Sequence, residues 1–450
     1  MKTNSYKLWS VVTLLFGFAF LSLWFSCSDE MDVDHDGVPD KQDHCKDIKG
    51  SKPNGCPILP KIGVVNLYLE TSASMGGYFT GSAAFKQIVS DLAVKIDKEI
   101  SPVKIHFISD TVRDYHADAT KFSSDIATTK IAFAKSSELH HIFDKIARAT
   151  KDGDVSIFVS DCILSFPNAQ VKANPDVNRQ SASSTLKNNI YSTFIELKKR
   201  KQAASLYAFS SGFFGKYYDY QNVKVPLNGT LRPFYVWVIA KNQVLPVFED
   251  KLAKIPNFDP EQEIHFGLMD QTVNTYRILT QLGRKGDYKL ISVGKAVSDI
   301  GVENVEAEKN QPVEFSAVVN LKALPPYARK LSYLQQNLKI ETVGCTANID
   351  ISECSKAIVL KNKTQIGYYE QASHVIKISV AQLRLANATL ALRVPLKYDS
   401  WYENWSTMND KNVKSLGKKT FALEHLVNGV MEAYNNTGKN FVDLKFKINQ

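Results

Sequence analysis

Residues 61–78, KIGVVNLYLETSASMGGY, decide the fold, because an apolar run typical of a buried strand ends here in a polar, serine-rich loop. Beyond this stretch, short apolar runs alternate with longer segments of helical periodicity. The expected strands span residues 62–69, 103–108, 155–159, 205–209 and 234–240, and the expected helices span 83–100, 139–147, 185–201 and 243–255. This alternation predicts an α/β fold with a doubly wound, mostly parallel sheet covered on both faces.

Polar side chains follow the first and the third of these predicted strands. Glu70, Ser72 and Ser74 come after the first strand, and Asp161 comes after the third. Ligands of parallel sheets bind beyond the carboxyl ends of the strands, so we expect these side chains to lie at one binding edge. Their hard oxygen atoms suit Mg²⁺ or Mn²⁺. The chemistry of these residues permits a divalent cation at this edge but does not require one.

The order of these motifs and elements, over about residues 61–256, resembles the von Willebrand factor A domain. The resemblance implies a metal-ion-dependent adhesion site, in which a carboxylate of a partner protein completes the coordination of the cation. Glu70 stands where the family has Asp, so the alternative is a metal-free site whose serines bond to the loop backbone and cap the next helix. The residues that the resemblance implies are Glu70, Ser72, Ser74, Ser137 and Asp161.

The N-terminus has the form of a secretory signal. Lys2 and Lys7 precede an apolar stretch over residues 11–25, which ends in Ser26 and Cys27 before a run of polar residues. It resembles a bacterial lipoprotein signal, with residues 1–26 removed and Cys27 acylated. The acidic residues that follow resemble the export signal of Bacteroidetes surface lipoproteins. We therefore expect an outer-membrane lipoprotein that is exposed at the cell surface.

Residues 32–43, DVDHDGVPDKQD, have the spacing of a calcium loop, with Gly37 at the sharp turn. Together with the following cysteines they resemble one thrombospondin type 3 repeat. We expect residues 27–60 to form a Ca²⁺-binding tether, and the alternative is an acidic stalk without an ion. The expected ligands are Asp32, Asp34, Asp36, the backbone carbonyl of Val38, Asp40 and Asp43.

The cysteines are consistent with an oxidising compartment. Cys45 and Cys56 lie close together in the sequence, as do Cys345 and Cys354, so two short-loop disulfides are plausible. Cys162 is left over and follows an apolar run without a neighbouring histidine or basic residue. We interpret it as a buried, unreactive thiol.

The C-terminal half, residues 286–450, has a different pattern. Short alternating segments over 288–397 predict an all-β sandwich-like domain. Residues 420–434 carry a helical apolar stripe that is expected to pack on the body of the protein. Residues 441–448 are expected to add a final edge strand. The predicted organisation is a signal peptide (1–26), a tether (27–60), an A-like domain (61–285) and a β-sandwich-like domain with a C-terminal helix (286–450).

Three features of the sequence bear on the partners and ligands of the protein. Tyr217, Tyr218 and Tyr220 lie between two predicted strands, where tyrosines supply contact area for a partner or pack as a hairpin on their own domain. The net charge of +9 is spread along the chain, which argues against a nucleic-acid partner. His140 and His141 are adjacent in a predicted helix, so we expect their rings to diverge and not to share a metal ion.

The leading functional hypothesis is non-enzymatic binding of a protein or glycan partner at the cell surface. No serine nucleophile with a histidine base can be assembled from the motifs. One alternative is a surface hydrolase of polysaccharide that uses Glu70 and Asp161 as an acid and base pair. Another is a metal-free structural component of an envelope assembly.

Overall fold

We describe a computed structural model of the 450-residue chain. The structure describes residues 37–45, 50, 54–56, 60–81, 83–128, 131, 138–164, 166–268, 272–292, 300–307, 311–322, 324–355, 358–434 and 439–450. The predicted signal peptide and the predicted ligands Asp32, Asp34 and Asp36 lie outside this part. The chain divides into two compact units, and the larger comprises residues 60–293 and 300–450. None of the helices in the described ranges has the length and apolar character that a membrane span requires.

The smaller unit contains a short disulfide-closed loop. Cys45 and Cys56 form the predicted disulfide. The backbone N–H of His44 donates to the carbonyl of Asn54 over 2.9 Å. Asp43, a predicted calcium ligand, is buried, and its Oδ1 accepts a hydrogen bond of 2.6 Å from the N–H of Cys45. Because half of the predicted ligand set lies outside the described residues, calcium binding here stays a prediction.

The larger unit contains a seven-stranded mixed sheet in the order β3-β2-β1-β4-β6-β5-β7. Its strands β1, β2 and β4 match predicted strands closely, whereas β3 and β7 were not predicted, and β1 pairs in parallel with both β2 and β4. The remaining pairings in this sheet are antiparallel. The strands are β1 (Val65–Glu70), β2 (Val103–Ile108), β3 (Val112–Asp114), β4 (Val155–Ser160), β5 (Gln202–Tyr218), β6 (Lys224–Lys241) and β7 (Gln262–Phe266).

The expectation of a doubly wound, mostly parallel sheet therefore needs correction for its second half. The aromatic stretch that we expected between two strands is itself strand, because β5 continues to Tyr218 and β6 begins at Lys224. A loop as short as residues 219–223 can join only antiparallel neighbours, since a parallel pair needs a long crossover. The parallel arrangement is confined to β2, β1 and β4, whose ends form the predicted binding edge.

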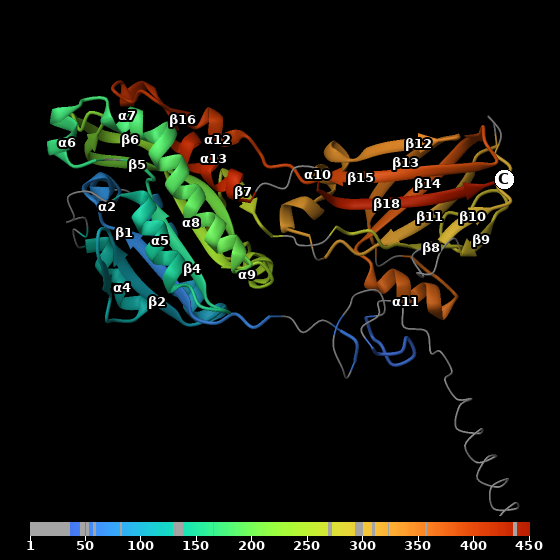
Figure 1. Cartoon of the computed structure of the whole chain (residues 1–450). Coiled ribbons are helices and arrows are strands. Elements are labelled where there is room, and N and C mark those ends of the chain that lie inside the picture. The colour runs from blue at the N-terminus through green and yellow to red at the C-terminus, as the bar shows by residue number, and fades with distance from the viewer. Residues whose placement is uncertain are drawn as a thin grey trace, which may run out of the picture. The chain divides into compact units, whose positions relative to one another are not determined.

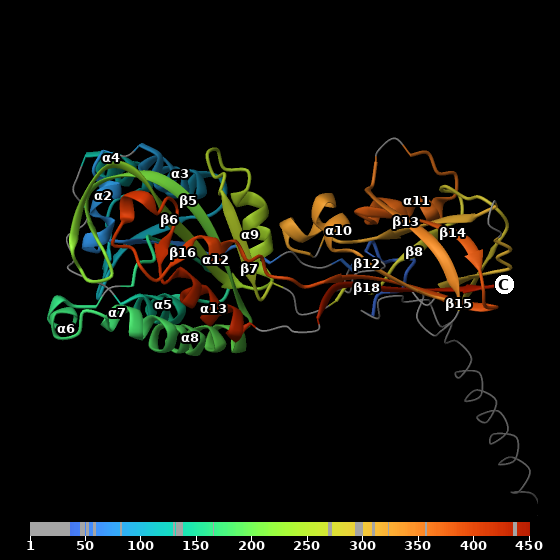
Figure 2. The same ribbon diagram turned by 90° about the horizontal axis from the view of Figure 1, so that it is seen from above.

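Helices cover both faces of the sheet, as the alternation in the sequence predicts (Figure 2). Successive residues of a strand point to opposite faces, so Leu67 and Leu69 of β1 enter one apolar core and Tyr68 enters the other. The first core includes α3 (Ala83–Glu99), α4 (Ala119–Thr128) and α9 (Val244–Leu252). The second includes α5 (Leu139–Ala149), α8 (Lys187–Lys199) and α13 (Leu423–Ala433).

The C-terminal apolar stripe forms α13, as predicted, but the helix does not pack with the β-sandwich. Figures 1 and 2 both show α13 beside α8, and Leu426, Val427 and Val430 share a core with Phe194. A buried Asp410 attaches the preceding segment to the same body by accepting hydrogen bonds from Tyr217 and Tyr220. The α/β body is thus completed by residues distant in sequence, which a boundary at residue 285 does not capture.

The β-sandwich consists of a five-stranded sheet, β12-β15-β18-β10-β9, and a four-stranded sheet, β13-β14-β11-β8, whose inner faces share one apolar core. The expected edge strand at the C-terminus is β18, which lies between β15 and β10 and is therefore internal. The strands are β8 (Arg277–Leu279), β9 (Lys289–Ser292), β10 (Ile300–Glu303), β11 (Val313–Val319), β12 (Lys339–Val343), β13 (Cys345–Glu353), β14 (His374–Leu383), β15 (Asn387–Pro395) and β18 (Asn440–Asn449).

Shorter elements complete the described chain. They are η1 (Ala73–Met75), α2 (Gly76–Phe79), α6 (Asn168–Ala173), α7 (Val177–Ser181), η2 (Ala182–Leu186), η3 (Pro326–Arg329), α10 (Leu331–Asn337), α11 (Lys363–Gln371), α12 (Trp401–Asn404), η4 (Val413–Ser415) and the two-stranded pair β16 (Ser406–Thr407) and β17 (Thr420–Phe421).

The second predicted disulfide is wrong, because Cys345 and Cys354 are both free thiols. Cys345 begins β13 and Cys354 directly follows its end. An extended strand of this length separates its ends by roughly 30 Å, whereas a disulfide requires Cα atoms within about 7 Å. Their closeness in sequence misled the prediction, because an extended backbone does not fold back on itself.

This correction predicts a defined pattern of thiol labelling. In denaturant without reductant, alkylation of the whole protein should modify Cys162, Cys345 and Cys354. Cys45 and Cys56 should become labelled only after reduction, because they are joined. Mass spectrometry of the digested chain reads the pattern. A crosslinked peptide that contains both Cys345 and Cys354 would contradict the structure.

Candidate functional site

The serine loop lies at the carboxyl end of β1 and leads into η1. Ser72 is buried and Ser74 is partly exposed, and their Oγ atoms are 2.9 Å apart. Ser72 occupies the N-cap position of η1, but its side chain makes no capping hydrogen bond. This finding argues against the alternative in which Ser72 serves only to cap the next helix. The two hydroxyl groups are hydrogen-bonded to each other, and both are neutral oxygen donors of the kind that Mg²⁺ accepts.

Two buried carboxylates stand beside this loop, at the ends of the neighbouring strands β1 and β4. Glu70 and Asp161 are 2% and 1% exposed. Glu70 Oε2 accepts a hydrogen bond from the Ser160 hydroxyl. Asp161 Oδ1 accepts one of 3.2 Å from the N–H of Ile163, whereas its buried Oδ2 has no hydrogen-bond partner of normal geometry among the described residues. An unpartnered carboxylate oxygen in the interior is costly.

The electrostatics of the pair follow from this geometry. Burial, followed by the negative charge of Glu70, raises the pKa of Asp161 to about 7. Hydrogen bonding to Ser74 and to the Ile163 N–H and the positive charge of Arg232 act in the opposite direction. Two adjacent carboxylates in the interior favour a positive charge between them or a proton on one of them. A divalent cation satisfies this need, and the donors present are all hard oxygens. The side chains therefore fit Mg²⁺ or Mn²⁺.

One predicted ligand cannot be placed in this arrangement. Ser137 lies outside the described residues, although α5 begins shortly after it, at Leu139. The structure thus brings together Glu70, Ser72, Ser74 and Asp161, which come from two segments about ninety residues apart.

Burial removes Tyr217 and Tyr220 from the predicted partner-binding surface. Their side chains are 2% and 4% exposed. The Tyr217 hydroxyl donates to Asp410 over 2.6 Å, and the Tyr220 ring stacks on Phe421. The hairpin therefore packs on its own body, as our alternative interpretation held. Tyr218 is partly exposed and lines a cavity of about 230 Å³ beside the serine loop.

The prediction that His140 and His141 diverge is also wrong. Their rings lie 4.1 Å apart, and each Nε2 lies 3.6 Å from Glu138 Oε2. These groups are close enough to share a metal ion. They sit, however, at the first turn of α5, where the helix dipole disfavours a cation. We therefore do not count this cluster as the functional site.

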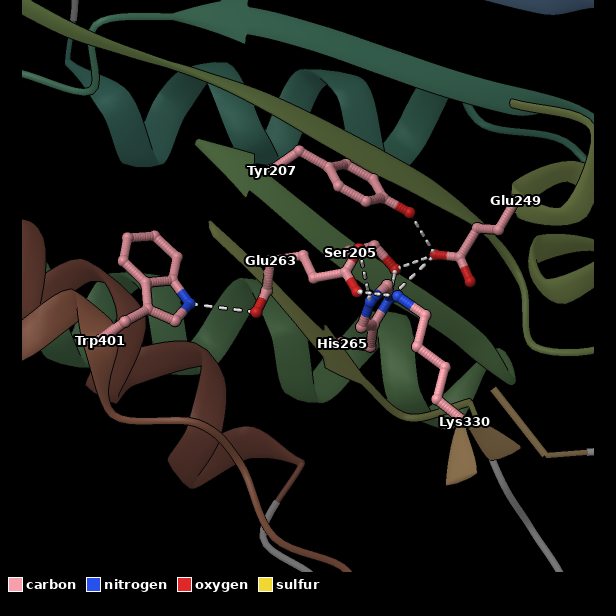
Figure 3. A network of polar contacts seen from close by, with 7 residues as sticks. All are labelled: Ser205, Tyr207, Glu249, Glu263, His265, Lys330 and Trp401. Atoms are coloured by element: carbon pink, nitrogen blue, oxygen red, sulfur yellow. Dashed lines mark hydrogen bonds and ion pairs between the residues drawn. The ribbon is translucent and has the colours of Figure 1, made fainter. Parts of the chain in front are cut away.

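A second polar site escaped the sequence analysis. His265 of β7 is buried between two carboxylates, with Nδ1 3.0 Å from Glu249 Oε1 and Nε2 3.7 Å from Glu263 Oε2. Figure 3 shows Glu249 Oε1 at the centre of this network, where it also accepts hydrogen bonds from the hydroxyls of Ser205 and Tyr207. The participants lie on a helix and two strands, and no sequence spacing relates them.

The network holds a proton on His265 at neutral pH. Burial alone would lower the pKa of His265. The negative charge of Glu249, the hydrogen bond that Glu249 accepts from the imidazole and the nearby Glu263 carboxylate together outweigh burial and raise this pKa to about 9. The Tyr327 ring stacks on the imidazole at 4.7 Å with an interplanar angle of 10°. His265 is therefore a buried cation compensated by Glu249, and not a proton donor poised near neutral pH.

Comparison with protein families, with curated protein sequences and with solved structures found no match for this chain.

Proposed function

We propose that this protein is a cell-surface lipoprotein that binds a protein or glycan partner through a divalent cation held at the carboxyl ends of β1 and β4. The observation that carries the proposal is the buried Asp161 carboxylate beside a second buried carboxylate, Glu70, and the two serine hydroxyls. In this proposal the α/β body is a von Willebrand factor A-like domain, and a Ca²⁺-binding tether connects it to lipid on Cys27.

The roles of the side chains follow from their positions. Asp161 and Glu70 supply the negative charge that attracts the cation, and Ser72 and Ser74 supply neutral oxygen ligands. Ser74 is the more exposed of the two serines, so the cation faces solvent on that side. An exposed carboxylate of a partner, or a pair of sugar hydroxyls, would complete the hard-oxygen shell there.

The hydrolase hypothesis receives less support. An acid and base pair must reach the scissile bond, but Glu70 and Asp161 are both almost fully buried. Of the three tyrosines expected to line a substrate groove, Tyr217 and Tyr220 are buried as well. The metal-free structural role remains the second candidate, and the deep burial of Glu70 with its bond from Ser160 favours it.

Titration calorimetry with Mg²⁺ and Mn²⁺ tests the proposal. The full chain should carry Asp34→Asn and Asp36→Asn, so that the predicted tether loop does not contribute. We expect one binding site, and we expect Ser72→Ala and Asp161→Asn each to weaken it at least tenfold, because each removes a ligand oxygen or a charge.

The control for this experiment is Ser124→Ala, which alters an exposed helical hydroxyl far from β1 and β4 in the sequence. It should bind Mg²⁺ like the parent. If neither ion binds the parent, or if the two site variants bind as well as the control, the cation-dependent proposal fails and the metal-free structural role replaces it.

A further inference from the structure

A cavity of about 400 Å³ in the larger unit lies beside the His265 network. Its walls come from β7, from η3 and α10, and from the segment that precedes α12. This volume falls within the range of about 300–1,000 Å³ that is typical of small-molecule sites. It is also separate from the serine loop, none of whose residues lines it.

The walls of this cavity are held by buried contacts. Tyr327 is stacked on His265, and Tyr333 meets Tyr327 edge to face at 5.3 Å. Beside the cavity, the indole N–H of Trp401 donates to the backbone carbonyl of Glu263, a lining residue, over 3.0 Å. Because these contacts involve buried or partly buried side chains, the cavity is largely formed before a ligand arrives.

The charges that line the cavity are balanced. Two carboxylates, Glu263 and Asp399, face two ammonium groups, Lys330 and Lys397. The third positive charge, on His265, is neutralised by Glu249, which does not line the cavity. A simple anion would meet two carboxylates here, and a simple cation would meet two lysines. This lining therefore disfavours a ligand with a net charge.

The uncharged part of the lining suits a ligand with many hydroxyl groups. Gln336 and Asn337 present amides that both donate and accept hydrogen bonds, and Ser332 and Ser400 add hydroxyls. Tyr333 and Tyr398 contribute aromatic surface. Carboxylates, amides and aromatic rings around one cavity match the alternating polar and apolar faces of a sugar ring.

We infer that this cavity is a binding site for a neutral sugar residue, free or at the end of a glycan. Its carboxylates accept hydrogen bonds from sugar hydroxyls, its lysines and amides donate to sugar oxygens, and the tyrosines cover the apolar face of the ring. The site needs no metal ion, so it is independent of the cation site proposed above.

Saturation-transfer NMR and calorimetry on the full chain, in EDTA, test this inference. The probes are glucose, galactose, mannose, N-acetylglucosamine and N-acetylgalactosamine, each as the monosaccharide and as a disaccharide. We expect at least one to bind with a Kd of about 1 mM or tighter. EDTA removes any contribution from the serine loop, so failure of one site is distinguishable from failure of the other.

Substitutions of residues that line the cavity test whether the sugar binds there. Gln336→Ala and Asp399→Asn should each weaken sugar binding at least about fivefold, because each removes or weakens a hydrogen-bonding group. Gln335→Ala is the matched control, since Gln335 is an exposed neighbour on α10 that does not line the cavity. It should bind like the parent.

Three outcomes would overturn the inference. One is that none of the sugars binds in the concentration range examined. Another is that the lining variants and the Gln335→Ala control bind equally well. The third is that inorganic phosphate or acetate displaces the sugar at low millimolar concentration, because the cavity would then be an anion site.

Discussion

Raising the pH from about 6.5 to about 9 is expected to lower the free energy of unfolding by roughly 2–3 kcal/mol through His265 alone. The folded pKa of His265 is raised to about 9, whereas the ordinary value is 6.5. Between these values the folded protein binds more protons than the unfolded chain, so its stability falls as the pH rises. Below the ordinary value this contribution is fully present.

The charged and titratable groups around His265 come from several elements. Glu249 lies on α9, Glu263 on the same strand as His265, and Tyr207 on β5. Tyr327, from η3, covers the ring. Burial raises the pKa of both tyrosines well above the ordinary value, and Glu249 and Glu263 add to this effect. These phenols therefore stay neutral through this pH range.

Urea denaturation followed by circular dichroism at several pH values measures the effect. Comparison with His265→Gln isolates it, since Asp161 also titrates near pH 7 in both proteins. In this variant the free energy of unfolding should no longer fall between about pH 6.5 and pH 9 through loss of the His265 proton. Glu249→Gln should move this fall to lower pH, because it removes the main charge that favours the imidazolium. An unchanged slope in both variants would show that His265 is not a buried cation.

Replacing Trp237 by Ala is expected to lower the free energy of unfolding by about 3–5 kcal/mol. Trp237 is fully buried in β6, and its ring meets Phe143 edge to face at 5.1 Å. Its indole N–H donates to Cys162 Sγ over 3.4 Å. Truncation leaves a large cavity in the core on which α5, α8 and α13 pack, and it removes the partner of the thiol.

The matched control is Tyr191→Ala on α8, because the Tyr191 side chain is exposed. Its effect should stay within about 0.5 kcal/mol. Urea denaturation of the parent and the two variants supplies the comparison. A loss below about 1 kcal/mol for Trp237→Ala would mean that this face of the sheet is not the packed core that the structure shows.

Local periodicity predicted several of the longer elements, although β3, α4 and β7 were not predicted. The strand expected over 103–108 is β2 (Val103–Ile108), and the helix expected over 83–100 is α3 (Ala83–Glu99). These elements carry apolar residues at the spacing of their own secondary structure, so their identity is a local property. The extent of β5 and β6 was not predicted, because their aromatic residues were placed between two strands, although the alternative interpretation was a hairpin packed on its own domain.

The positions of the candidate site residues could be predicted for the same reason, whereas a cation among them was only what the resemblance implied. Glu70 and Asp161 each directly follow an apolar run, and parallel strands bring their carboxyl ends to one edge. The burial of these carboxylates, which decides their electrostatics, was not predictable. It depends on Met75 and the other side chains that the fold places around them.

The sequence by itself determined the strands β1, β2 and β4, the position of Glu70 and Asp161 at one edge of the sheet, and the Cys45–Cys56 disulfide, because each depends on residues close together or on a rule for parallel strands. Only the tertiary structure decided that α13 completes the α/β body, that Cys345 and Cys354 stay apart, and that His265 meets Glu249 beside a cavity. Those outcomes rest on packing between segments distant in the chain, which no local pattern of residues encodes.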